Sequence, residues 1–242
     1  MTDQTSRVSP RLQARIAGFL YLIIIVAGAF GYTSSSTLIV WNDAAATAGN
    51  ILASEQLWRL SLGAMLVMLA CDVAVAAIFY VLFKPVNKTL SLLGFAFRLV
   101  LVAIVGVTML ARYAPLLLLK DAASAAFGTD QMQALGLLSI RLFERGFTVA
   151  LVFFGFHCLV IGWLIFRSGF LPRILGVLLV IAGLCYLTDS FVYLVFPVVV
   201  LPFDIVVLSY IVELALCLWL IVMGVNAEKW KEQADAAWAS QA

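Results

Sequence analysis

Six long apolar runs, separated by short polar segments, constrain this chain more than any other feature of its sequence. Each run approaches or exceeds the length of about 20 apolar residues that an α-helix needs to cross a bilayer. Inside a membrane every backbone polar group must be hydrogen-bonded within the protein, so only helices or a closed barrel can span it. Barrel strands alternate apolar and polar side chains over about ten residues, whereas these runs are unbroken. The sequence therefore predicts an all-α, polytopic membrane protein.

The runs give approximate bounds for six transmembrane helices. They cover residues 16–33, 57–83, 90–119, 147–166, 171–196 and 203–225. The composition agrees, because 64% of the 242 residues are hydrophobic and 12% are charged, against about 45–50% and about 25% in soluble domains. We therefore expect a six-helix membrane domain over residues 16–226. It follows an N-terminal segment, 1–15, and precedes an amphipathic C-terminal tail, 227–242.

The distribution of lysine and arginine predicts the orientation, since short loops rich in these residues stay in the cytoplasm. Nine of them fall on the side of the N-terminus: Arg7, Arg11, Arg15, Lys84, Lys88, Arg167, Arg173, Lys229 and Lys231. Five fall on the other side: Arg59, Arg112, Lys120, Arg141 and Arg145. The bias predicts a multi-pass protein of the cell inner (plasma) membrane with both termini cytoplasmic.

The first run has a second interpretation as a cleaved signal peptide. Arginines precede it, and Ala27-Gly28-Ala29 has the small side chains of a cleavage site. Cleavage would leave five spans and an external N-terminus. Because the apolar run continues past this site to Tyr32, retention as a transmembrane helix is the preferred interpretation.

Two outer segments have the pattern of short interfacial helices. Asn42 or Asp43 is a suitable cap for a helix reaching residue 57, and Thr129 or Asp130 for a helix over residues 130–145. The second would place four apolar side chains on one face: Met132, Leu135, Leu138 and Leu142. The C-terminal tail is expected to extend the sixth transmembrane helix onto the cytoplasmic surface.

Three ionisable residues from three different runs lie at the same depth. Asp72 is twelve residues from Lys84, Arg98 is ten from Lys88, and His157 is ten from Arg167. At 1.5 Å per residue these spacings place all three roughly 15–18 Å into the bilayer. An ionisable group at that depth costs about 2.5–3.5 kcal/mol, so such groups are usually paired and often functional. We predict that they form a cluster and are the candidate catalytic residues.

A simpler interpretation of this cluster is also open. Asp72 and Arg98 would then form a buried ion pair that only fixes the register of two helices, with His157 donating a hydrogen bond to a carbonyl.

A second polar layer is predicted toward the outer face. Tyr186, Asp189 and Tyr193 share one stripe of the fifth run, and Tyr210 and Glu213 share a stripe of the sixth. The outer-side cations able to balance these acids are Arg112, Arg141 and Arg145. The pattern predicts a polar pocket that opens outward, with the Asp72–Arg98–His157 cluster at its floor. Its candidate ligand-binding residues are Asp189, Glu213, Tyr186, Tyr193, Tyr210 and Arg145. Partly hydrated groups without a ligand are the alternative.

The sequence favours neither a cofactor nor a metal site. A single histidine excludes bis-histidine haem within one chain, and zinc would need His157 with carboxylates such as Asp72, an unusual ligand set. No HExxH, GxSxG or P-loop motif occurs. The cysteines lie inside apolar runs without a CxxC pair and have the pattern of small buried side chains: Cys71, Cys158, Cys185 and Cys217. A net charge of +2 without a basic tract predicts no nucleic-acid partner, which leaves membrane lipid as the expected surrounding.

Several segments together resemble a bacterial membrane family catalogued as domain of unknown function 4386. They are residues 14–22 (ARIAGFLYL), 42–48 (NDAAATA), 154–159 (FGFHCL), 167–176 (RSGFLPRILG) and 186–190 (YLTDS). The resemblance covers nearly the whole chain. It implies a bacterial inner-membrane protein, and it carries over no catalytic role, because the family has no established activity.

Three functions follow from these patterns. The leading prediction is a module that binds a small amphiphilic molecule in the outward-facing polar pocket. The first alternative is a membrane enzyme acting on a lipid or quinone, with His157 as general base and Asp72 orienting it. The second is a structural partner subunit that performs no chemistry.

Overall fold

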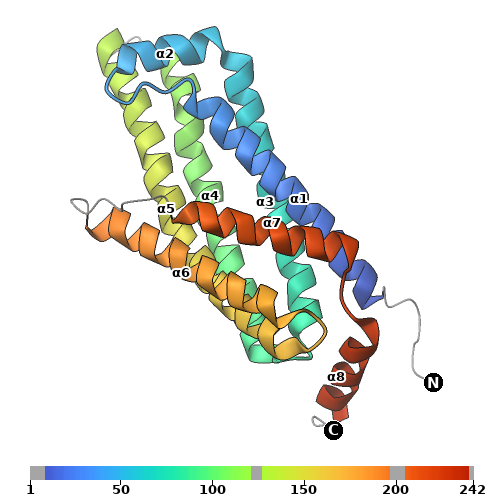
Figure 1. Ribbon diagram of the computed structural model, residues 1–242. Coiled ribbons are helices and arrows are strands. Elements are labelled where there is room, and N and C mark those ends of the chain that lie inside the picture. Colours follow the sequence, from blue (N-terminus) through green and yellow to red (C-terminus); the bar gives the residue numbers. More distant parts are fainter. Residues whose placement is uncertain (1–8, 121–126, 197–204, 240–242) are drawn as a thin grey trace.

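The computed structural model describes residues 9–120, 127–196 and 205–239, and within them it contains helices and no strand (Figure 1). The helices are α1 (Pro10–Ser36), α2 (Ala44–Ala53), α3 (Glu55–Phe83), α4 (Lys88–Lys120), α5 (Thr129–Ser168), α6 (Arg173–Val195), α7 (Val206–Val222) and α8 (Ala227–Ala239). Five of these, α1 and α3 to α6, are long and apolar enough to cross a membrane, and the bent pair of α7 and α8 would supply a sixth span. The chain is a multi-pass membrane protein, as its apolar runs predict.

The apolar helices close into a ring. Each of α1, α3, α4, α5, α6 and α7 packs against the next in this order, and α7 packs back against α1. The pairs α4–α5 and α5–α6 have the most extensive contacts, whereas α6 and α7 cross the other helices obliquely (Figure 1). The ring places one face of every apolar helix toward a common centre, where side chains far apart in the sequence can meet.

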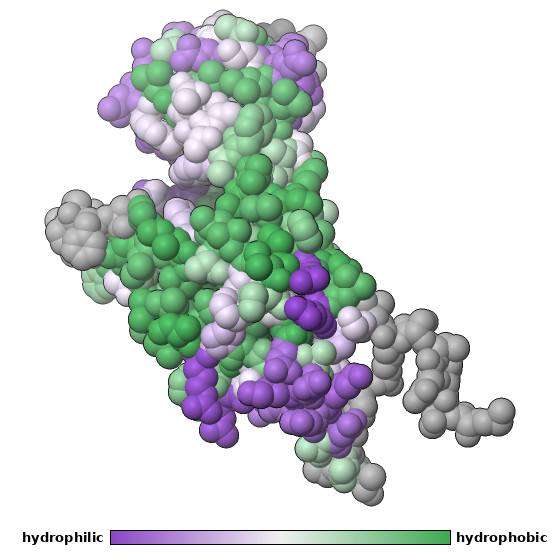
Figure 2. Space-filling view, turned by 45° about the vertical axis from the view of Figure 1, so that its right-hand side comes forward, coloured by the Kyte–Doolittle hydropathy of each residue, from purple (hydrophilic) through white to green (hydrophobic). Residues whose placement is uncertain are grey.

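The two ends of the ring are polar and the zone between them is apolar. We call the end at which α1 begins, and at which α8 lies, the terminal end, and the opposite end the α2 end (Figure 1). Figure 2 shows a hydrophilic cap around the α2 end, an apolar band, and a hydrophilic cluster at the terminal end. This is the surface expected of a protein that spans hydrocarbon between two aqueous phases.

The first predicted interfacial helix is confirmed as α2. Asp43 is its cap, with Oδ1 accepting a hydrogen bond from the backbone nitrogen of Ala46 at 2.8 Å. The hydroxyl of Thr47 bonds to the carbonyl of Val40 at 3.0 Å and so ties the helix to the preceding loop. The following helix, α3, begins at Glu55.

The second predicted interfacial helix is wrong as a separate element. Residues 129–168 form one helix, α5, capped by Gly128 rather than by Thr129 or Asp130. Its 40 residues span about 60 Å, far more than the apolar thickness of a bilayer. The half of α5 near the α2 end packs against α4 and α2, and Ile140 and Phe143 are buried in it. Of the four side chains predicted to form its apolar face, Met132 is buried and the three leucines are exposed: Leu135, Leu138 and Leu142.

The C-terminal tail is also corrected, because it does not continue the sixth transmembrane helix. The chain bends by 96° between α7 and α8. Gly224 adopts the left-handed conformation there, with φ of 67°, which ends α7. Asn226 caps α8 by accepting hydrogen bonds from the backbone nitrogens of residues 228 and 229. The indole of Trp230 donates to the carbonyl of Leu82 at 2.9 Å and fixes α8 against the end of α3. Phe203, the predicted start of the sixth span, lies outside the described residues.

Glycines allow α5 and α6 to approach at backbone distance. A Cβ placed on Gly162 would lie 2.7 Å from the carbonyl oxygen of Gly176, and one on Gly183 would lie 2.8 Å from the carbonyl oxygen of Gly155. The seven-residue spacing of Gly176 and Gly183 therefore serves helix packing, as is common in membranes. Gly169, which continues that spacing toward the N-terminus, lies outside the helix and provides the left-handed end of α5.

Candidate functional site

The three ionisable residues predicted to share one depth contact one another at the centre of the ring. Arg98 on α4 donates from Nε and Nη2 to Oδ1 of Asp72 on α3, at 2.8 and 2.5 Å. Its Nη1 lies 3.3 Å from Nε2 of His157 on α5. All three side chains are buried, with exposed fractions of 1% to 5%. The sequence prediction of a three-helix polar cluster therefore agrees with the structure.

The hydrogen bonds of His157 define its protonation. Its Nδ1 lies 2.8 Å from the carbonyl oxygen of Gly94, which can only accept, so Nδ1 carries the proton. Because Nη1 of Arg98 can only donate, Nε2 of His157 is the unprotonated acceptor. The imidazole is therefore neutral and uses both nitrogens, and its ring stacks on Phe154 with the centroids 5.7 Å apart.

The cluster extends to the other three helices of the ring. Tyr21 of α1 donates its hydroxyl hydrogen to Oε2 of Glu213 on α7 at 2.8 Å, and the hydroxyl of Tyr186 on α6 donates to Oε1 of the same carboxylate. The ring of Tyr21 also lies 5.1 Å from the guanidinium carbon of Arg98. Tyr21 therefore joins the Asp72–Arg98–His157 cluster to Glu213 and Tyr186. We call the resulting set, with one residue from each helix of the ring, the six-helix network: Tyr21, Asp72, Arg98, His157, Tyr186 and Glu213.

Glu213 lies at the centre of the ring instead of in a separate outer layer. If the sixth helix continued straight into the tail, Glu213 would lie sixteen residues before Lys229, about 24 Å from the cytoplasmic charges and so toward the outer face. Since α7 ends at Val222, Glu213 lies nine residues from the helix end, about 14 Å. That is nearly the same depth as Asp72 and Arg98. The bend after α7 therefore accounts for the difference between the predicted and the observed depth of Glu213.

The six-helix network contains two carboxylates and one guanidinium. Arg98 binds Asp72 directly, and Tyr21 links Arg98 to Glu213 by contacting both. With His157 neutral, the described residues supply one positive charge for two acidic groups. An uncompensated charge in a membrane is costly in free energy. One further proton or cationic group would balance the charge of the network, and Glu213 is the group to which it would bind.

A line of side chains connects the network to the surface. Tyr210 of α7 is 59% exposed, and its ring makes an edge contact with Tyr186, with the centroids 6.4 Å apart. Tyr186 in turn bonds to Glu213. Three of the residues predicted to bind a ligand, Tyr210, Tyr186 and Glu213, thus form a continuous path from the surface to the centre of the ring. Figure 2 shows that the molecular surface is hollowed between the α2 end and the region where α6 and α7 lie.

The other three predicted ligand-binding residues lie outside the network. Arg145 of α5 is exposed and places its guanidinium 4.1 Å from the ring centroid of Tyr193, which is 44% exposed on α6. Nη1 of Arg145 also lies 3.5 Å from the carbonyl oxygen of Tyr193. Asp189 is half-buried on α6. All three residues are on the α2 side of the network, where Arg145 pairs with Tyr193.

Sequence reasoning missed a second buried cation site near the α2 end, here called the outer cluster. Arg112 of α4 is 1% exposed and lies between the rings of Trp58 and Phe143, at 5.3 and 4.4 Å. Its Nη1 lies 3.5 Å from Oε1 of Glu144, and its Nη2 donates to the hydroxyl of Ser35. Arg112 therefore pairs with Glu144 and not with the acids of α6 and α7.

Glu144 and Tyr21 are the partners that the sequence did not reveal. Glu144 lies among residues that were expected to form an interfacial helix. It is half-buried because these residues are part of α5 and pack along α4. Its Oε2 also accepts a hydrogen bond from the hydroxyl of Tyr32 at 3.1 Å. Tyr21 is one aromatic residue in an apolar run, a pattern that does not distinguish a buried donor from a lipid-facing ring.

Within the described ranges, no group of three histidine, cysteine, aspartate or glutamate side chains has the proximity needed to hold a metal ion. The cysteines are free thiols, and the thiol of Cys217 donates to the carbonyl of Gly18 at 3.3 Å where α7 crosses α1. The chemistry available in the six-helix network is thus that of carboxylate, guanidinium, imidazole and phenol groups.

Comparison with known proteins identifies the family. The family described as "Domain of unknown function (DUF4386)" matches residues 16–224. The chain belongs to this family. An uncharacterized protein of Archaeoglobus fulgidus is 26% identical over 164 residues, covering 68% of this chain and 83% of the relative. No solved structure matches. The DUF4386 match spans every residue of the six-helix network.

Proposed function

We propose that this protein binds a small amphiphilic molecule on the side of the six-helix network that faces the α2 end. The observation that carries the proposal is the position of Glu213. It is a second carboxylate beside a single arginine, and it is connected to the exposed Tyr210 through Tyr186. A ligand whose polar head bears a positive charge or a hydrogen-bond donor would balance the excess acidic group, and its apolar part would contact the aromatic side chains.

Under this proposal the remaining network residues support Glu213. Arg98 stays paired with Asp72, and Tyr21 holds the carboxylate of Glu213 against α1. His157 would orient the guanidinium of Arg98, since its Nε2 accepts a hydrogen bond from Nη1 and its Nδ1 is held by the carbonyl of Gly94. The bias of nine against five basic residues supports a plasma-membrane location with both termini cytoplasmic. The α2 end, and with it the approach to Glu213, would then face outward.

Native mass spectrometry of the detergent-purified protein tests this proposal. We expect the wild-type chain to retain a small molecule and Glu213→Gln to retain it at least about tenfold less, because a charge-assisted hydrogen bond contributes about 1.5–3 kcal/mol. Glu144→Gln is the matched control, since it makes the same change in the outer cluster and should leave the bound molecule in place.

Three results would count against the proposal. The first is a wild-type protein that retains no small molecule, which would favour a structural partner subunit. The second is equal loss in the Glu213 and Glu144 variants. The third is turnover of an added lipid or quinone that disappears in His157→Ala while the bound molecule stays, which would favour the membrane enzyme.

A further inference from the structure

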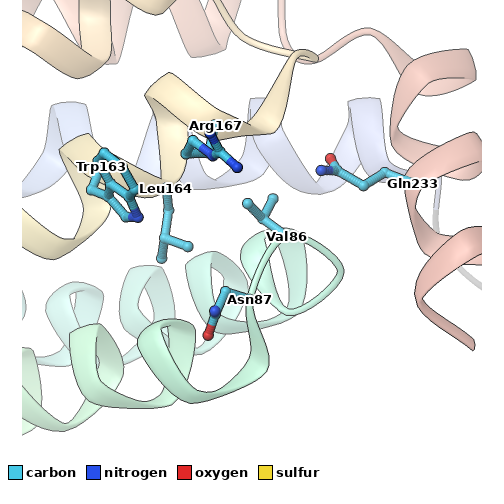
Figure 3. A pocket seen from close by; sticks show the side chains of 6 residues that line it. All are labelled: Val86, Asn87, Trp163, Leu164, Arg167 and Gln233. Carbon is cyan, nitrogen blue, oxygen red and sulfur yellow. The ribbon is translucent and has the colours of Figure 1, made fainter. Parts of the chain in front are cut away.

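A pocket of about 230 Å³ lies at the terminal end, away from the six-helix network (Figure 3). Three segments form it: the turn between α3 and α4, the last turns of α5, and α8. Its lining residues are Val86, Asn87, Trp163, Leu164, Arg167 and Gln233. The pocket exists because α8 turns back beside the ends of α3 and α5 instead of extending α7, and the hydrogen bond from Trp230 to Leu82 holds α8 there.

The polar groups of the pocket lie on opposite walls. Figure 3 shows the side chains of Arg167 and Gln233 directed toward each other across the opening, with Val86 below them. Oε1 of Gln233 is buried and accepts no hydrogen bond from the described part of the chain. Since a buried acceptor without a donor is costly, it favours a ligand that supplies a donor. The guanidinium of Arg167 supplies the opposite chemistry, a cation with several N–H groups.

The apolar groups of the pocket place it at the edge of the membrane. Trp163 is 49% exposed, and the guanidinium carbon of Arg167 lies 5.7 Å from its ring. Tryptophan on the surface of a membrane helix near its end is typical of the layer of lipid headgroups. The apolar side chains of Val86 and Leu164 complete a lining suited to the region where a headgroup meets its acyl chains.

We propose that this pocket binds a phosphate group, and specifically the phosphodiester of an anionic membrane lipid whose headgroup carries hydroxyl donors. Arg167 binds the phosphate oxygens, because a guanidinium matches phosphate in geometry and charge. A headgroup hydroxyl donates to Oε1 of Gln233. The acyl chains leave the pocket along Trp163. Basic pockets between helix ends are a recurring form of lipid site, and Lys84 and Lys88 flank the turn that forms one wall.

Native mass spectrometry of the detergent-purified full chain with added phosphatidylglycerol or phosphatidylcholine tests this site. Both lipids carry a phosphodiester, but only phosphatidylglycerol carries hydroxyl donors and a net negative charge. We expect the wild type to retain about tenfold more phosphatidylglycerol than phosphatidylcholine, and Arg167→Gln to lose about tenfold of the phosphatidylglycerol bound. Gln233→Leu should reduce the preference between the two lipids.

Arg173→Gln is the matched control, because Arg173 is a basic residue at the same end, packs on Phe166 and does not line the pocket. It should bind phosphatidylglycerol as the wild type does. Circular dichroism of each variant verifies that the helices are intact. Equal loss in the Arg167 and Arg173 variants, or no preference between the lipids, would overturn the proposal. Displacement of the lipid by excess inorganic phosphate would assign the pocket to a free phosphate ion and overturn the lipid assignment.

Discussion

Replacing Arg98 by methionine is expected to lower the free energy of unfolding by about 3–5 kcal/mol, which is the usual cost of removing one partner of a buried ion pair. The substitution keeps much of the side-chain volume and removes the charge. It leaves the carboxylates of Asp72 and Glu213 in the centre of the ring with no cation to balance them. It also removes the hydrogen bond to Nε2 of His157 and the contact with the ring of Tyr21.

Unfolding in mixed detergent micelles, followed by circular dichroism, measures this change. Asp72→Leu should be destabilising for the same reason, since it leaves the guanidinium of Arg98 without its direct partner. The double variant Arg98→Met, Asp72→Leu should be more stable than the sum of the single effects predicts, because neither member of the Arg98–Asp72 pair is then left without the other. If each single variant lost less than about 1 kcal/mol of unfolding free energy and the two losses were additive in the double variant, Arg98 and Asp72 would not form a buried ion pair.

Arg112→Met is expected to destabilise the α2 end by about 1.5–3 kcal/mol, the contribution of hydrogen bonds to charged groups. It removes the ion pair with Glu144, the bond to Ser35, and the contacts with two aromatic rings. The effect should be smaller than at Arg98 for two reasons. The side chain of Glu144 is 17% exposed, so water can solvate it. Nε of Arg112 also has no acceptor among the described residues, so the native interaction is incomplete.

Arg59→Met provides the comparison for this second prediction. Arg59 lies on α3 and pairs with Glu55 at 2.8 Å, a shorter distance than in the Arg112 pair, but its side chain is 49% exposed. Exposed ion pairs contribute about 0–1 kcal/mol. The same unfolding measurement should therefore separate the two variants clearly. Equal effects would mean that Arg112 is solvated in the folded protein and that the outer cluster is not buried as described.

The membrane spans and the centre of the six-helix network could be predicted from the sequence for one physical reason. Hydrocarbon excludes both unpaired backbone groups and isolated charges. The first exclusion makes every long apolar run a helix. The second requires Asp72, Arg98 and His157 to face the protein, and counting residues along straight helices gives their common depth. The same reasoning extends to Glu213 once the helix is known to end at Val222.

The features that the sequence did not reveal depend on contacts between distant segments. The apolar pattern of residues 129–146 does not show whether they lie along the membrane surface or continue the transmembrane helix. They continue α5 because α4 is long enough to pack beside them. The pairing of Arg112 with Glu144 follows from that arrangement. Gly224 marks the end of α7, but the direction of α8 is set by its contact with Leu82. Tyr21 carries no charge, so its burial beside Arg98 leaves no signal in composition.

The six-helix network connects helices around the whole ring, so a change at one of its residues affects more than one helix contact. A two-helix ion pair would fix only one contact, whereas Glu213 joins α7 to α1 and α6 through two tyrosine hydroxyl groups. The charge at this carboxylate therefore affects contacts at both sides of α7, the helix that closes the ring. A ligand bound at Glu213 would change the same contacts, which links the proposed binding site to the packing of the whole bundle.

A double-mutant cycle between Tyr21 and Glu213 tests most directly whether the network closes the ring. Tyr21→Phe removes the donor hydroxyl group, and Glu213→Leu removes the acceptor carboxylate, so unfolding free energies of the four proteins isolate the interaction between α1 and α7. We expect a coupling free energy of about 1.5–3 kcal/mol, typical of a hydrogen bond to a charged group. The pair Tyr21→Phe and Glu144→Gln should be additive, because these residues belong to different clusters. A Tyr21–Glu213 coupling indistinguishable from zero would contradict a six-helix network.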